Sequence, residues 1–463
     1  MTQFSEKAPK YVFILALLLT SFGYGYVAHR KDLFPSSLIR KAEMGFAMLW
    51  NRERPWYYIE TAHASPTTQP KPGNGQPGLT LIAGIGPKNR HFAAVVDQDG
   101  RTINHWDLDW FKLWPESAHL DDEVRPRSPP GPVVHGLQLM EDGGLVFNFE
   151  ALGMVRVDVR GNVVWRLPLA THHSLERDGN GNFWTSVRRT HKAADPRLPN
   201  FQPPFFEYTI VEISPEGRVL REESIVDLLQ ENGLQGLLYL ATYYDETTQI
   251  GGDTFHLNDV EPFPAHMTPG FFRPGDVMVS LRRANAVIVF DLPARKVRYV
   301  SIGGFLRQHD PDFVDGNSIS VFDNNNLGGR EQGFQSRVVL EKAPEGERRV
   351  AFAGTAERPF YTEIMGKHQW LPNGNLLLVE SRGGRVVEVD PDGDIVWEYV
   401  NLVEAGVAGL VSEGMRLPET ITAEFFDERR RERGSAIAAE PDAGAESPAA
   451  AHPATNAPAG DEH

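Results

Sequence analysis

One pattern, a strand, a turn and a second strand, returns along most of the chain and restricts its fold more than any other feature. In each copy an alternating apolar strand enters a turn that carries Gly or Pro, and another strand follows. These copies read VVDQDGRTINHW, VRVDVRGNVVW, IVEISPEGRVL, VIVFDLPARKVRYV and VVEVDPDGDIVW. Inner hairpins precede them, among them LMEDGGLVFNF, ERDGNGNFWTSV and LPNGNLLLVES. Paired hairpins in series predict an all-β fold of four-stranded antiparallel blades, a β-propeller.

Counting one inner and one outer hairpin per blade predicts a six-bladed propeller. The blades fall at 79–108, 135–169, 173–226, 256–304, 317–352 and 368–400. The first and fifth copies are degenerate, so five or seven blades stay open as alternatives. Trp165 and Trp397 occupy the same place in D-x-x-G-x-x-x-W, and we expect both indoles to pack between blades rather than to contact a ligand.

The ends of the chain differ in composition from the repeats. Residues 11–28, YVFILALLLTSFGYGYVA, are uncharged and apolar, which predicts a transmembrane anchor with a cleaved signal peptide as the alternative. The tail is rich in Ala, Pro, Asp and Glu and predicts disorder. The predicted parts are an N-terminal flank (1–10), the anchor (11–28), a juxtamembrane amphipathic segment with a Pro/Gly-rich linker (29–78), the β-propeller catalytic domain (79–403), a C-terminal extension (404–434) and a disordered tail (435–463).

Charge and missing motifs exclude several classes of function. The formal net charge of −16, with no basic stripe, argues against nucleic acid as a partner. The chain has no cysteine, which excludes disulfides, thiolate metal sites and a cysteine nucleophile. It also lacks the GxxxxGK[ST] phosphate loop, and the spacing of its histidines matches no tight metal motif. We therefore expect no cofactor and no metal.

Histidines recur at the openings of the repeats. They are His135, His173, His256 and His368, and His172 adjoins the second of them. Equivalent positions of propeller blades converge on one axis, so these imidazoles are expected to meet in one funnel. A later strand carries Ser280-Leu281-Arg282-Arg283, and the connection that leaves its blade carries Gln308-His309-Asp310, which we expect to be a loop.

In these segments the chain resembles the bacterial arylsulfotransferase family, the PAPS-independent aryl-sulfate sulfotransferases, which are six-bladed propellers. The resemblance covers roughly 79–400 and rests on the order HHSLERDGNGNFW, HLND, GDVMVSLRR and QHD. It implies His309 as nucleophile, with His173 (or His172), His256 and Arg282 around the sulfuryl oxygens. Arg283 is the alternative to Arg282, because neighbouring strand residues face opposite ways. The chain departs from the best-known members in lacking their cysteine pair, cleaved signal peptide and separate N-terminal β-domain.

The residue types suit that chemistry. A neutral imidazole is available near pH 7 and could attack the sulfur of an aryl sulfate, and arginine and histidine donors suit the sulfuryl oxygens. The resemblance implies ping-pong transfer through a sulfohistidine to a phenolic acceptor, in a single-pass protein of the bacterial inner membrane with a periplasmic propeller. The basic residues Arg30 and Lys31 after the anchor disagree with that orientation. A metal-dependent propeller lyase or hydrolase, and a non-catalytic tethered binding module, are the other hypotheses.

Aromatic residues occur in the long insertions between strands, which we expect at the mouth of the funnel. They are Phe205, Phe206, Tyr243, Tyr244, Phe271 and Phe272. Such side chains suit a wall for a phenolic substrate. The stretch DLLQENGLQGLLYLATYY in one insertion has helical spacing.

Overall fold

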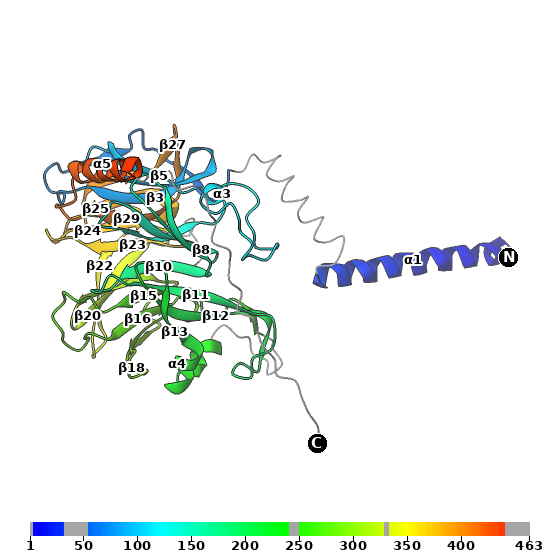
Figure 1. Cartoon of the computed structure of the whole chain (residues 1–463). Coiled ribbons are helices and arrows are strands. Elements are labelled where there is room, and N and C mark those ends of the chain that lie inside the picture. Colours follow the sequence, from blue (N-terminus) through cyan, green and yellow to red (C-terminus); the bar gives the residue numbers. More distant parts are fainter. Residues whose placement is uncertain (1–2, 32–53, 240–249, 328–332, 440–463) are drawn as a thin grey trace, which may run out of the picture.

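A computed structural model describes residues 3–31, 54–239, 250–327 and 333–439 (Figure 1). The predicted disordered tail lies outside the described residues except for its first five positions, which end helix α5 (Ala423–Ala439). Residues 32–53 of the predicted juxtamembrane segment (29–78) also lie outside them. The described chain consists of an N-terminal helix and a large body of antiparallel sheets.

Six four-stranded antiparallel sheets build that body, so the predicted six-bladed propeller is confirmed. From the inner strand outward, the first blade consists of β29 (Val411–Arg416), β3 (Thr80–Gly86), β4 (Arg90–Val96) and β5 (Thr102–Asp107), and the second of β6 (Val134–Leu139), β7 (Leu145–Phe149), β8 (Gly153–Val157) and β9 (Val163–Leu167). The third blade consists of β10 (Thr171–Arg177), β11 (Phe183–His191), β12 (Phe201–Ile213) and β13 (Val219–Ser224), and the fourth of β15 (Leu257–Pro262), β16 (Asp276–Leu281), β17 (Ala286–Asp291) and β18 (Lys296–Ile302). The fifth blade consists of β19 (His309–Asp315), β20 (Ser318–Asp323), β21 (Arg337–Lys342) and β22 (Glu347–Ala353), and the sixth of β23 (Lys367–Trp370), β24 (Leu376–Glu380), β25 (Arg385–Val389) and β26 (Ile395–Val400).

The remaining elements decorate the blades. Strand β14 (Ile250–Gly252) pairs in parallel with β12, β2 (Thr67–Thr68) extends the sixth blade beyond β26, and β1 (Tyr58–Glu60), β28 (Val407–Gly409) and β27 (Leu402–Glu404) form a small sheet. The short helices are α3 (Trp110–Leu113), α4 (Ile225–Glu231) and 3-10 turns at Pro87–Asn89, Gln235–Tyr239, Arg282–Ala284 and Ser381–Gly383. Helix α4 and the turn at Gln235–Tyr239 match most of the predicted helical stretch, residues 232–234 between them are not helical, and residues 240–244 lie outside the described residues.

The inner strands form a closed ring. Each of β29, β6, β10, β15, β19 and β23 contacts the next, and β23 returns to β29. The first blade is completed from the other end of the chain, because β29 pairs antiparallel with β3. Residues 411–416 therefore belong to the propeller, although we expected this part of the chain to be a separate C-terminal extension.

The fifth blade also starts earlier than expected. Its inner strand β19 begins at His309, and His309 pairs with Phe322 of β20. The prediction that His309 lies in a loop leaving the fourth blade is therefore wrong. The segment HDPDFVD has too little apolar alternation to be recognised as a strand, but its neighbours β15 and β23 close the ring on both sides.

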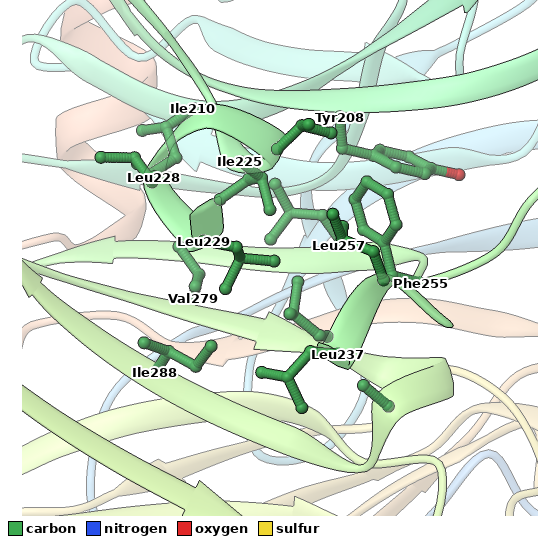
Figure 2. Packing of buried hydrophobic residues seen from close by; sticks show 14 of the residues in the cluster. Tyr208, Ile210, Ile225, Leu228, Leu229, Leu237, Phe255, Leu257, Val279 and Ile288 are labelled. Carbon is green, nitrogen blue, oxygen red and sulfur yellow. The ribbon is translucent and has the colours of Figure 1, made fainter. Parts of the chain in front are cut away.

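Apolar side chains gather where blades meet. In the described chain each of the six blade interfaces holds one buried hydrophobic cluster. Figure 2 shows the cluster between the third and fourth blades, where Ile210 of β12 and Ile225 and Leu228 of α4 lie near Val279 and Ile288. Burying each such side chain contributes roughly 1.5–3 kcal/mol, so these interfaces make the ring a rigid support for groups on its axis.

Indole side chains join successive blades. Trp106 Nε1 on β5 donates to Asp158 O, 3.0 Å away, and Trp165 on β9 donates to Pro215 O at the same distance. Trp397 on β26 closes the ring by donating to Gln98 O, also at 3.0 Å. The predicted interblade role of Trp165 and Trp397 is confirmed.

The N-terminal helix α1 (Gln3–Lys31) contains a 20-residue stretch, Pro9–Ala28, with a mean hydropathy of 1.7. Its side chains make little contact with the rest of the protein, since only 6% of this stretch is buried. The helix is long and apolar enough to cross a membrane. A signal sequence near the N-terminus has a similar length and composition, so α1 is either a membrane-spanning anchor or a signal sequence.

Candidate active site

Irregularities in the inner strands turn side chains toward the axis. The pairing of β6, β10, β15 and β19 shifts register close to their first residues, at His135, His172, Leu257 and His309. Such β-bulges re-aim the side chains beside them. The backbones of His173, His256 and Asp310 adopt left-handed conformations, with φ of 56°, 52° and 49°. For residues with a Cβ this conformation costs energy and clusters at functional sites.

A pocket of about 710 Å³ opens where the inner strands begin. His309, His256, Arg282 and His173 all line it, so the structure brings together the four side chains selected from the sequence. The other lining residues are Trp56, Val124, Pro126, Ser128, Gly131, Pro132, Val133, Glu150, Ala151, Leu152, Arg188, Ile364 and Met365. The pocket is thus polar at its histidines and arginines and mainly apolar elsewhere.

The hydrogen bonds around His309 determine which ring nitrogen is free. Its Nδ1 lies 2.7 Å from Oδ1 of Asn324, and the Asn324 amide nitrogen donates to Thr362 O at 2.9 Å and Met365 O at 2.7 Å. Two carbonyl acceptors require the amide NH₂ on their side, so Oδ1 faces His309 and accepts its Nδ1–H. The Nε2 atom then carries the lone pair. Burial, together with the charge of Arg282, holds the pKa of His309 well below its ordinary value and keeps the ring neutral.

Arg282 forms no ion pair within 4 Å among the described residues, and the carboxylates of Asp253 and Glu150 act on its charge from farther away. It lines the pocket from the 3-10 turn that follows β16. Burial, with the charges of Arg307 and Arg283, lowers its pKa to about 10, so it remains charged at pH 7. Arg283 instead lies 3.5 Å from Asp253. The structure thus separates the two candidates: Arg282 lines the pocket, and Arg283 contacts a carboxylate behind it.

His256 and His173 contact each other directly. Their Nε2 atoms are 2.8 Å apart, and Nδ1 of His256 lies 2.5 Å from Oδ2 of Asp253. Tyr208 donates its hydroxyl to the other oxygen of Asp253, at 3.0 Å. Burial lowers the pKa of His256 against the opposing effect of Asp253. Burial and the neighbouring imidazoles lower the pKa of His173 further, so both rings are neutral in the empty pocket.

His172 lies behind His173, with ring centroids 4.0 Å apart. Its Nδ1 is 3.3 Å from Leu257 O, and its Nε2 is 3.4 Å from Glu150. Burial alone would raise the pKa of Glu150, but the hydrogen bond and charge of His172 lower it to about 2, so this pocket residue is an ionised carboxylate. Of the two adjacent histidines, His173 lines the pocket.

The other two repeat histidines have different surroundings. His135 is buried, its ring centroid 4.6 Å from that of His173, and burial lowers its pKa to about 4. His368 lies in a second cavity at the far ends of the inner strands, with Nδ1 3.0 Å from Asp310 and Nε2 2.7 Å from Ser320 Oγ. Asp310 also accepts from Lys367 Nζ, at 2.7 Å. These contacts tie β19 to β23 directly behind His309.

Sequence reasoning missed four polar residues of this site: Asn324, Asp253, Glu150 and Tyr208. Asn324 stands in a run of Asp and Asn that reads as an ordinary turn, and Asp253 closes an insertion. Of the predicted aromatic wall, Phe205 and Phe272 are buried in interblade clusters, and Phe206 and Phe271 are partly buried against the same clusters, so none of these four lines the pocket. Tyr243 and Tyr244 lie outside the described residues.

Three histidines come close enough to share a metal ion. Ligand nitrogens of His172, His173 and His256 lie within 4.8 Å of one another. Asp253 behind His256 is the kind of carboxylate that orients metal-bound histidines. Arg282 in the same pocket opposes a cation, however, and suits an anion.

Fold and pocket together define a six-bladed propeller whose axial pocket is lined by three imidazoles, the guanidinium of Arg282 and the carboxylate of Glu150. The chain belongs to the arylsulfotransferase (ASST) family, whose sequence profile matches residues 136–402, more than half of the chain. The matched region contains His173, His256, Arg282 and His309. No curated protein matches the chain significantly.

Solved structures similar to this chain include three bacterial proteins. A protein of unknown function from Bacteroides caccae has a TM-score of 0.42 at 12% identity, over 72% of this chain and 97% of that one. The periplasmic gluconolactonase of Pseudomonas aeruginosa has 0.39 at 11%, over 74% and 99%. Virginiamycin B lyase from Staphylococcus aureus has 0.34 at 10%, over 77% and 99%. Scores and identities this low carry no argument about chemistry, and the fold rests on the sheet topology.

Proposed function

We propose that the protein is an aryl-sulfate sulfotransferase that moves a sulfuryl group from an aryl sulfate to a phenolic acceptor through a sulfohistidine at His309. One observation carries the proposal. A neutral imidazole with its Nε2 lone pair free shares a pocket with Arg282, a cation that forms no close ion pair among the described residues. A nucleophile beside an anion-binding group is what sulfuryl transfer requires.

In the first half-reaction Nε2 of His309 attacks the sulfur, the N–S bond forms and the S–O bond to the aryl group breaks. Arg282, His256 and His173 bind the three sulfuryl oxygens, and the aryloxide leaves with a proton from a pocket histidine that has become an imidazolium on substrate binding and returns to the neutral imidazole. In the second half-reaction a phenol oxygen attacks the sulfur and the N–S bond breaks. The phenol proton returns to the pocket. Membership of the family supports aryl sulfates as donors.

The apolar lining suits the aryl part of both substrates. Donor and acceptor occupy the same place in turn in a ping-pong reaction, and an apolar wall with few polar groups accepts different phenols. Trp56 and Val124 stand at this wall and are about half exposed, at 47% and 49%. We further propose that α1 is an uncleaved anchor that holds the propeller at the periplasmic face of the inner membrane.

The test is sulfuryl transfer by the purified full-length chain in detergent, with 4-nitrophenyl sulfate as donor and phenol as acceptor. We expect acceptor-dependent release of 4-nitrophenolate, loss of that release in His309→Ala, and one sulfuryl group on the His309 peptide after donor alone. His105→Ala removes an exposed histidine of β5 outside the pocket and serves as the control. Full activity in a folded His309→Ala protein would refute the nucleophile assignment.

A metal-dependent lyase or hydrolase is the second candidate, favoured by the close ligand atoms of His172, His173 and His256. It predicts stoichiometric metal in the purified protein and loss of activity with chelator. A folded protein that turns over no aryl sulfate and carries no metal would support the third hypothesis, a tethered binding module.

A further inference from the structure

A carboxylate stands behind one of the two contacting histidines and not behind the other. Asp253 follows β14, and its Oδ2 accepts from Nδ1–H of His256 at 2.5 Å while Tyr208 donates to its Oδ1. Nδ1 of His173, by contrast, is buried and has no hydrogen-bond partner among the described residues. His256 therefore has a counter-ion for a positive charge, and His173 has none.

The 2.8 Å contact between the two Nε2 atoms limits the protons in the empty pocket. Two N–H groups cannot point at each other at this distance, and two lone pairs would repel. The contact therefore holds one hydrogen. Since Nδ1 of His256 already donates to Asp253, the arrangement with both rings neutral places that hydrogen on Nε2 of His173.

Burial and the positive charge of Arg282 oppose a second proton on the ring of His256 when no anion is bound. The titratable and charged groups that face it are Asp253, His173, His172, Arg282, Glu150, His309 and Tyr208. Burial disfavours the imidazolium, and Arg282 adds to this effect. Arg283, 3.5 Å from Asp253, compensates part of the charge of that carboxylate. An anion beside Nε2 reverses the balance, because it adds a second negative neighbour to the ring.

We propose that Asp253 is a positioning residue that lets His256 take up one proton from solvent when a sulfate or sulfuryl anion enters the pocket. The anion separates the two imidazoles. His256 then donates Nδ1–H to Asp253 and Nε2–H to one anion oxygen, while His173 donates its own Nε2–H to another. The inference rests on the proposed function to the extent that this pocket binds a sulfuryl group. It requires no turnover.

Calorimetric titration of the full-length protein in detergent with inorganic sulfate at pH 7 tests the proposal. Tris and triethanolamine, which differ in ionisation enthalpy and carry no sulfonate, reveal protons taken up on binding. We expect about one proton per sulfate in the wild type. In Asp253→Asn we expect little uptake and sulfate binding weakened about 10- to 100-fold, the loss of one charge-assisted hydrogen bond. Asp253→Glu keeps a carboxylate and should retain part of the uptake.

Asp195→Asn is the matched control. It neutralises another partly buried carboxylate 3.7 Å from a histidine, His191, outside the pocket, and should leave proton uptake unchanged. Nitrogen NMR of the wild-type histidines with and without sulfate covers the case in which Asp253→Asn does not fold, since His256 should become doubly protonated.

Sulfate binding without proton uptake, uptake that persists in folded Asp253→Asn, or no sulfate binding at all would overturn the proposal. Sulfate binding with uptake but no transfer from aryl sulfates would leave it standing and remove only the proposed transferase activity.

Discussion

At the scale of single residues the site depends on which atoms of its histidines carry hydrogen. Three imidazoles line the pocket, yet each has a different partner: Asn324 for His309, Asp253 for His256, and His256 itself for His173. One residue type thereby presents a lone pair at Nε2 of His309 and, in the proposed anion complex, N–H donors at Nε2 of His256 and His173. The hydrogen-bond partner of each imidazole therefore determines which of its nitrogens carries hydrogen and which is free to act in the pocket.

Asn324→Ala should reduce transfer without removing the nucleophile. The substitution leaves Nδ1 of His309 without an acceptor, so the ring can adopt the tautomer with hydrogen on Nε2, which cannot attack. We expect kcat/KM to fall about 10- to 100-fold, as for other residues that orient reactive histidines. It also leaves Met365 O without a donor and removes one of the two donors to Thr362 O, which still accepts from Ser336 Oγ, at a cost of about 1–3 kcal/mol at most. Kinetics on the folded fraction, with NMR of the His309 tautomer, separate the two effects; unchanged kcat/KM would contradict the prediction.

Arg282→Gln should move the acid limb of the pH profile. Attack needs neutral His309, so kcat/KM falls as the pH drops through the pKa of that residue. Burial and then Arg282 hold this pKa below its ordinary value of 6.5, so the limb of the wild type lies below that pH. Removing the arginine raises the pKa, and the limb moves toward neutral pH, in addition to a lower maximal rate. Arg188→Gln also alters a pocket arginine and should leave the limb in place.

At the scale of elements, blade interfaces carry the stability that holds the bulged inner strands in place. Trp397 is 1% exposed and joins the sixth blade to the first, whereas Trp165 is only partly buried at its own interface. The tryptophan of the same motif therefore contributes more to stability at the interface of Trp397 than at the interface of Trp165.

Trp397→Phe should destabilise the protein more than Trp165→Phe. Each change removes one indole N–H donor, but only at position 397 does it also leave a void in a closed core. We expect a loss of about 2–4 kcal/mol at Trp397 and about 1 kcal/mol at Trp165, measured by urea unfolding followed by tryptophan fluorescence and circular dichroism. Equal losses would mean that the hydrogen bond alone matters.

Sequence reasoning predicts the regular parts of this fold and misses the irregular ones. Hairpins with alternating apolar strands and turn residues identify most blades, because each copy carries its own pattern. The inner strand β19 has Pro311 and three aspartates and shows no such pattern. Strand β29 has no neighbouring hairpin in the sequence, since its partner β3 lies near the other end of the chain. Asp253 contacts His256 three residues later, and Asn324 contacts His309 of its own blade, but no sequence pattern marks either pair, so only the three-dimensional structure reveals them.

At the scale of the whole molecule, the ring is closed by residues far apart in the chain. Removal of residues 404–463 should prevent folding, because it deletes β29, the inner strand of the first blade, and exposes the edge of β3. Removal of 440–463 alone retains every described strand and should leave thermal unfolding unchanged. Circular dichroism and limited proteolysis of the two truncated proteins make the comparison. A folded product from the shorter chain would show that β29 is dispensable.

The pairing of β29 with β3 also imposes an order on biogenesis. A chain made from its N-terminus presents β3 early and β29 only after five other blades have been synthesised. Until β29 is synthesised, the inner edge of β3 in the first blade has no pairing partner. Closing the ring joins two strands that lie more than 300 residues apart in the chain. Joining contacts so distant in sequence is intrinsically slow. An incomplete chain is thus exposed to proteases and to aggregation until β29 is synthesised, which makes late ring closure a checkpoint that only chains containing β29 pass.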